Sequence, residues 1–119
     1  MKIIQMLNRF YVNDMDVAVA FYEKLFNQKC TVRFRYDEVH LELAQIADIL
    51  ILAGSEEALR PFIETKATFV VDSITEFKDY LLSNGAFIVR DLKQVPTGMN
   101  MTMKHADGTV VEYVEMKKE

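Results

Sequence analysis

The strongest constraint on the fold is a residue pattern that the chain carries twice. In "YVNDMDVAVAFYEKLF" (residues 11–26) a strand-like run ends in valine, and a capping residue then opens an amphipathic helix. The run "VVDSITEFKDYLL" (residues 70–82) repeats this order 59 positions later, so that Val12 corresponds to Val71 and Asp14 to Ser73. Each helix has apolar residues at the spacing of one buried stripe, which are Ala18, Phe21, Tyr22 and Leu25 in the first helix and Ile74, Phe77 and Leu81 in the second. Two copies of so long a unit predict two similar modules sharing one core. A chance likeness between two amphipathic helices is the alternative.

Strand signals follow both helices. Three alternating or apolar runs, "CTVRFRYD", "VHLELAQI" and "DILILAG", come after the first helix. The second is followed by "AFIVRDL" and by "GMNMTMKHADGTVVEYVE", in which Asp107-Gly108 predicts a tight hairpin. We therefore expect an α+β fold in a single domain over residues 1–119, with a first βαβββ module at 1–53, a connector at 54–65 and a second βαβββ module at 66–116. The modules would form a curved mixed sheet with a concave cleft.

Composition excludes several functional classes. The net charge of −4 argues against nucleic acid, because phosphate binding needs a basic face. The lone cysteine, Cys30, cannot form an internal disulfide, so no oxidising compartment is implied. No stretch approaches the ~18 apolar residues of a membrane span, and polar residues interrupt any signal-peptide core at the N-terminus. These features predict a cytoplasmic protein that binds neither nucleic acid nor membrane.

The run at residues 11–26 and the closing run "DGTVVEYVE" (residues 107–115) resemble the vicinal-oxygen-chelate superfamily, which includes glyoxalase I, bleomycin-resistance proteins and extradiol dioxygenases. The resemblance extends over about residues 2–115. It implies the paired-module fold and a small-molecule ligand in the cleft. Short chains of this family commonly dimerise, so the resemblance also implies a homodimer. Whether the modules swap between chains in that dimer stays open.

In metal-using members of the superfamily, four side chains on the first and last strands of the two modules hold a divalent ion. By resemblance these positions are Leu7, Ile51, Lys66 and Glu112 in this chain. Leu and Ile offer no donor atom. A protonated lysine ~4 Å from a divalent ion would be repelled by about 8 kcal/mol at an effective dielectric constant near 20. We therefore expect no metal and no other cofactor, an apolar contact between Leu7 and Ile51, and an ion pair between Lys66 and Glu112.

Strand alternation and the resemblance together predict which side chains line the cleft. The alternating methionines at residues 99, 101 and 103 are assigned to the core, and the residues between them to the cleft. The pattern leaves the strand at residues 39–44 open, because either Val39, Leu41 and Leu43 or His40 and Glu42 could face inward. The expected ligand-binding set is Leu7, Arg9, Tyr11, Ile51, Lys66, Thr68, Val70, Asn100, Thr102, Lys104 and Glu112.

The charges of this set predict the ligand. Arg9, Lys66 and Lys104 oppose the single carboxylate of Glu112, which favours an anionic ligand. Arg9 could instead pair with an acid of the protein, such as Glu112. The first hypothesis is a metal-free protein that sequesters or senses a small anionic molecule. The alternatives are a glyoxalase-type lyase or isomerase with Glu112 as catalytic base, and an interaction module whose cleft is filled by its own side chains.

Overall fold

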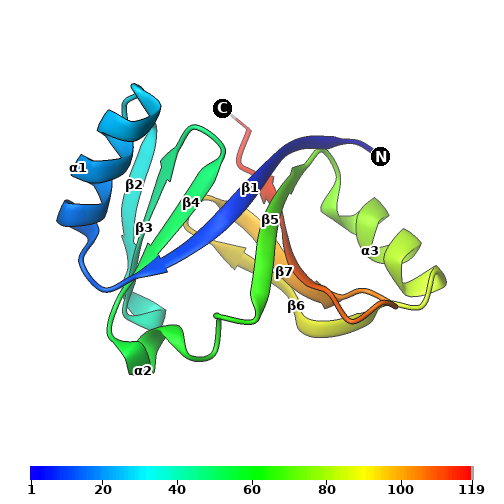
Figure 1. The fold of residues 1–119 in the computed structure, drawn as a ribbon. Coiled ribbons are helices and arrows are strands. Elements are labelled where there is room, and N and C mark those ends of the chain that lie inside the picture. The colour runs from blue at the N-terminus through cyan, green and yellow to red at the C-terminus, as the bar shows by residue number, and fades with distance from the viewer. Residues whose placement is uncertain (119) are drawn as a thin grey trace. The chain divides into compact units, whose positions relative to one another are not determined.

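The structure is a computed structural model that describes residues 1–118. Its elements run strand, helix and three strands, twice over, which confirms the predicted α+β fold (Figure 1). No helix within residues 1–118 is both long and apolar enough to cross a membrane. The elements are β1 (Ile3–Val12), α1 (Met15–Phe26), β2 (Val32–Tyr36), the 3₁₀ helix η1 (Asp37–Val39), β3 (Leu41–Ile46), β4 (Ile49–Ala53), α2 (Glu56–Leu59), β5 (Thr65–Val71), α3 (Ile74–Ser83), β6 (Phe87–Val95), β7 (Gly98–Lys104) and β8 (Val110–Met116).

The repeat seen in the sequence marks equivalent points of the structure. Strands β1 and β5 end at Val12 and Val71, and helices α1 and α3 begin at Met15 and Ile74. Both pairs of residues lie 59 positions apart. The two strand-to-helix corners are therefore built in the same register, and positions of α1 can be compared with positions of α3 residue by residue.

The chain forms two compact units. One comprises residues 8–64 and is called the α1 unit here; the other joins residues 1–7 to the chain from residue 65 onward and is called the α3 unit. Strand order is β2-β3-β4-β1 in the α1 unit and β1-β5-β8-β7-β6 in the α3 unit. The pairs β1·β4 and β5·β8 are parallel, and the pairs β2·β3, β3·β4, β6·β7 and β7·β8 are antiparallel. Strand β1 thus contributes its C-terminal half to one unit and its N-terminal half to the other.

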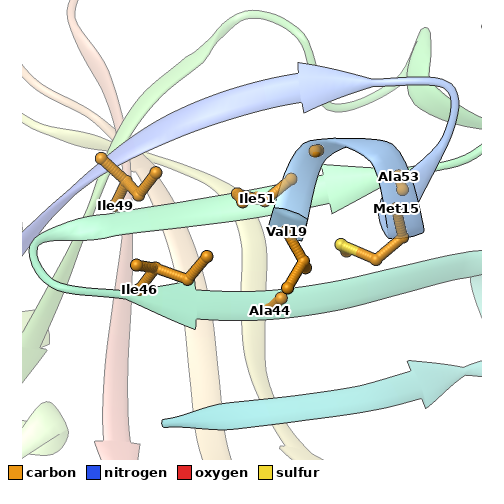
Figure 2. Packing of buried hydrophobic residues seen from close by; sticks show 8 residues of the cluster. Met15, Val19, Ala44, Ile46, Ile49, Ile51 and Ala53 are labelled. Carbon is orange, nitrogen blue, oxygen red and sulfur yellow. The ribbon is translucent and has the colours of Figure 1, made fainter. Parts of the chain in front are cut away.

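Helix α1 packs on one face of the strands of its own unit. The Asp14 side chain accepts a hydrogen bond from the Val17 backbone N–H (3.2 Å), which satisfies an otherwise unpaired donor of the first turn. Met15, Ala18 and Val19 are buried against β3 and β4 (Figure 2). The core of the α1 unit is therefore a layer between one helix and one sheet face.

Helix α3 packs on its strands in the same way. Its first N–H, on Ile74, donates to the Glu115 carboxylate (2.9 Å), so that β8 caps the helix. Met101, Met103 and Tyr113 are buried in the cluster beneath the helix. The predicted core-facing phase of the methionine strand is confirmed. Burial raises the pKa of Tyr113 to about 12, and its hydroxyl is hydrogen-bonded to His105 Nε2 (2.7 Å).

Candidate functional site

Three adjacent strands of the α3 unit carry a carboxylate and two neutral side chains that donate hydrogen bonds to it. Glu112 on β8 accepts hydrogen bonds from the Thr68 hydroxyl on β5 (2.9 Å) and from the Asn100 side-chain amide on β7 (3.3 Å). Thr68 is only 1% exposed, and Glu112 is half-buried. The structure thus brings together three of the predicted ligand-binding residues. Hydrogen bonds to a charged acceptor of this kind stabilise by about 1.5–3 kcal/mol each.

The pairing register shows which other residues share a face with this carboxylate. Thr68, Glu112 and Thr102 pair in one row across β5, β8 and β7, and Val70, Val114 and Asn100 pair in the next. Directly paired residues project to the same side of a sheet. This is the side opposite α3, because the intervening residues of β7 and β8 are buried beneath that helix. The face, called the Glu112 face below, carries six predicted residues: Thr68, Val70, Asn100, Thr102, Lys104 and Glu112.

Two cationic residues that the sequence analysis missed belong to the same face. Arg90 of β6 pairs with Thr102, and Lys93 pairs with Asn100. Together with Lys104 they place three positive charges beside one carboxylate. Alternation could not have found them, because the β6·β7 register shifts twice, between residues 88 and 90 and between residues 90 and 93. Each shift is an irregularity that breaks the period of two.

Lys66 does not take the predicted position beside Glu112. It is the extra residue at an irregularity of β5, where Thr65 pairs with Val110 and Ala67 already pairs with Val111. Its side chain is exposed, and it forms no ion pair with Glu112 within residues 1–118. The predicted ion pair is therefore wrong. A bulge residue is displaced from the regular pleat, which a prediction based on alternation cannot anticipate.

Ile51 was assigned to the cleft, and the structure places it in the core instead. It is 0% exposed and clusters with residues of α1 such as Val19 (Figure 2). Its neighbours Leu50 and Leu52 pair with Arg9 and Tyr11 and so occupy the opposite face. The assignment of Ile51 to the ligand-binding set is wrong by one residue in phase. All five residues of β4 are buried, so the run "ILILA" contains no polar residue that could set the phase.

In the α1 unit, the predicted residues Arg9 and Tyr11 form a short hydrogen-bonded chain. Arg9 Nε donates to the Tyr11 hydroxyl (2.7 Å), which donates to the Phe62 carbonyl (2.6 Å). The guanidinium carbon lies 5.5 Å from the centre of the Tyr11 ring. These bonds tie β1 to the segment after α2. The remaining predicted residue of β1, Leu7, is 3% exposed and belongs to the α3 unit.

The structure resolves the phase that the sequence left open for residues 39–44. Leu43 pairs with Leu52 and so lies on the face opposite α1. Glu42 lies on the α1 side, where its carboxylate accepts a hydrogen bond from Arg33 (2.6 Å), itself bonded to Asp16 of α1 (2.6 Å). The two carboxylates raise the pKa of the Arg33 guanidinium. Of the two alternatives, the leucine set faces away from the helix.

The residues present do not fit a divalent metal ion at the position that the family resemblance implies. Only Glu112 among the four corresponding residues offers an oxygen donor, and replacing Ile51 by its neighbour Leu50 or Leu52 adds none. Within residues 1–118, no group of three or more His, Cys, Asp and Glu side chains is arranged to hold a metal.

The chain thus has the architecture of the paired-βαβββ proteins, in which each of two βαβββ units has a core covered by a helix. The profile of the Glyoxalase/Bleomycin resistance protein/Dioxygenase superfamily matches residues 3–113. Because the match extends over most of the chain, the protein belongs to this superfamily. The predicted membership is confirmed. No curated protein matches the chain in a sequence search.

Solved structures agree with this family assignment. An uncharacterized protein from Methanosarcina mazei is 50% identical, with a TM-score of 0.89 over 100% of this chain and 97% of that one. Methylmalonyl-CoA epimerase from Mycobacterium tuberculosis is 17% identical, with a TM-score of 0.79 over 98% and 90% of the two chains. The Streptomyces coelicolor epimerase with 2-nitronate-propionyl-CoA is 12% identical, with a TM-score of 0.78 over 98% and 100%. The likeness to the two epimerases is one of fold.

Proposed function

We propose that this protein binds a small anionic molecule on the Glu112 face without the help of a metal. The observation that carries the proposal is the grouping of Arg90, Lys93 and Lys104 on the face that carries Glu112. The chain as a whole has a net charge of −4, so this concentration of positive charge is local. Such a local field raises the concentration of anions at the face and speeds their association.

The polar residues of the face suggest how a ligand would be oriented. Arginine and lysine favour carboxylate and phosphate groups, with arginine able to bind them through two parallel hydrogen bonds. The Glu112 carboxylate, already held by Thr68 and Asn100, would accept a hydrogen bond from a hydroxyl or amide of the ligand. A ligand with an anionic group and a nearby donor therefore fits this arrangement best.

A thermal-shift screen against small carboxylates and phosphates, followed by calorimetric titration, tests the proposal. A ligand at 100 times its Kd stabilises the folded state by about 2.7 kcal/mol. We expect Lys104→Gln and Arg90→Gln to weaken the binding of a hit several-fold. The matched control is Lys29→Gln, which removes an exposed lysine from the loop after α1 in the other unit. A screen without any stabilising anion, or an equal loss in the control, would contradict the proposal.

A second candidate function is catalysis by Glu112 as a general base, as in a glyoxalase-type lyase or isomerase. Its support is the geometry of a half-buried carboxylate positioned by two neutral side chains. Turnover of a candidate substrate that persists in excess chelator and is abolished in Glu112→Gln would favour this function. Binding without turnover would favour the sequestering or sensing protein.

We also infer that the protein acts in the cytoplasm as a homodimer. The dimer rests on the family membership, because short chains of this kind commonly associate in pairs. The cytoplasmic location rests on the single cysteine, which leaves the chain no internal disulfide. The dimer can be tested by sedimentation alone, with no ligand identified.

A further inference from the structure

Helix α1 carries a second apolar stripe that its own unit does not bury. Val17, Phe21 and Leu25 are 65%, 58% and 62% exposed. Residues four apart in an α-helix lie above one another on the same side. The three side chains therefore form one row along α1, separate from the buried Met15, Ala18 and Val19 that face the strands. The sequence predicts Phe21 and Leu25 in the buried stripe, and that prediction is wrong, because both lie beside the core-facing side of the helix and not on it.

The equivalent positions of α3 show that the fold does not require this stripe. A shift of 59 residues carries Val17, Phe21 and Leu25 to Glu76, Tyr80 and Asn84. All three of these are exposed, and each carries a polar group. Two helices that begin in the same register and cover their own sheets thus differ in this row, which is apolar on α1 and polar on α3 and its C-cap. We infer that the apolar row on α1 serves association rather than folding.

The size of the stripe decides what kind of association it can support. Phe26, at the end of the helix, lies on the opposite side from Val17 and stacks on Tyr22, so it does not extend the row. A phenylalanine offers roughly 150–250 Å² of surface, so the three side chains of the row together expose on the order of 300 Å². Contiguous apolar patches of about 300–600 Å² on soluble proteins are often functional. Standard interfaces bury about 800 Å² per partner, so contact through α1 alone corresponds to a small interface of the weak, transient class.

We propose that the stripe binds the same stripe of a second copy of this chain, with the two α1 helices antiparallel and Phe21 near the twofold axis. One charge pair favours that direction, because Asp14 lies at the N-terminal end of the helix and Lys24 in its last turn. Asp16 is already bonded to Arg33, and Glu23 lies next to Lys24. An antiparallel pair brings Lys24 of each helix toward Asp14 of the other and opposes the two helix dipoles. Because identical patches face each other, the contact also stops at two copies and does not extend into a chain of molecules.

The overall charge argues against a lipid surface as the occupant of this stripe. Helices that lie on membranes pair an apolar face with many lysines and arginines, which are attracted to anionic lipids. Helix α1 has one lysine, and the protein has a net charge of −4. The proposal therefore deepens the homodimer of the proposed function, and it is independent of which ligand the Glu112 face binds.

The test replaces the stripe by the residues that α3 carries. The variant Val17→Glu/Phe21→Tyr/Leu25→Asn is compared with the wild type by sedimentation velocity over a wide concentration range. We expect a concentration-dependent dimer for the wild type and at least a tenfold weaker dimer for the variant. The matched control is Leu82→Asn, which removes an exposed leucine (43%) from α3 and should leave dimerisation unchanged.

Each outcome bears on a different part of the proposal. A variant that dimerises as well as the wild type overturns the stripe as the interface and leaves the homodimer intact. A wild type that stays monomeric at every concentration overturns both. If the wild type is monomeric and binds phosphatidylserine vesicles and the variant does not, the occupant of the stripe is a lipid surface and not a second copy of the chain. If the variant fails to fold, Phe21→Cys in a Cys30→Ala background provides the test: oxidation should cross-link it as a dimer, and no cross-link overturns the proposal.

Discussion

The two units use the same scaffold but differ in the face turned away from the helix. In the α1 unit that face carries Leu43, Leu50 and Leu52 on adjacent strands, together with Arg9 and Tyr11 of β1. In the α3 unit the corresponding face carries Glu112 and its hydrogen-bonding partners. The helix-covered faces of both units are mainly apolar. The fold is therefore specified largely by one alternate set of strand positions. The other set is available for ligand chemistry and differs between the units, with Arg9 and Tyr11 in one and the Glu112 carboxylate in the other.

The largest effect should come from the apolar core of the α1 unit. We expect Ile51→Ala to lower the free energy of unfolding by about 2–5 kcal/mol, because it leaves a cavity in a packed layer. A double-mutant cycle with Val19→Ala, followed by denaturant unfolding, should give a coupling energy of about 0.5–3 kcal/mol. Additive effects would mean that Ile51 does not pack against α1. Ile4→Ala, at a position that is 61% exposed, is the control and should change stability by less than about 0.5 kcal/mol.

An intermediate effect is expected on the polar face of the α3 unit. Thr68→Val removes the hydroxyl that donates to Glu112 and should cost about 1.5–3 kcal/mol in denaturant unfolding. Thr102→Val is the matched control, because Thr102 is also buried (5% exposed) and is the strand partner of Glu112. Unlike the Thr68 hydroxyl, the Thr102 hydroxyl is not a hydrogen-bond donor to the Glu112 carboxylate. Equal losses in the two variants would show that the Thr68 hydroxyl has no special role in positioning Glu112.

The smallest effect concerns the response of the α3 unit to acid. The backbone N–H of Lys2 donates to the Asp72 carboxylate (2.8 Å) and lowers the pKa of that group. A carboxyl whose pKa is lower in the folded state stabilises the protein above its unfolded pKa, near 4, and loses this contribution as the pH falls through the folded pKa. Between pH 5 and pH 3 the melting temperature of Asp72→Asn should fall less steeply than that of the wild type. Parallel curves would contradict this linkage.

The sequence predicted the boundaries and the strand phase of elements in which polar residues alternate with apolar ones or cap a helix. It failed where such polar residues are absent. The alternation of Met101 and Met103 with polar neighbours fixed the phase of β7, and the cap residue Asp14 fixed the start of α1. Strand β4 is buried on both faces, so its residues gave no sign of which face Ile51 occupies. Lys66 and Arg90 lie at irregularities of the sheet, and such irregularities depend on the pairing of two strands rather than on either run alone.

Strand β1 also has a consequence for how the protein is made. Its first half is hydrogen-bonded in the α3 unit, where Asp72 N–H donates to the Lys2 carbonyl, although α1 and three further strands come between them in the chain. At about 5–20 residues per second, synthesis from Leu7 to Val71 takes roughly 3–13 s. During that interval Ile3, Ile4 and Met6 have no strand of their unit to join. This segment is thus synthesised before all the strands of the α1 unit that follow it and can be paired only after them.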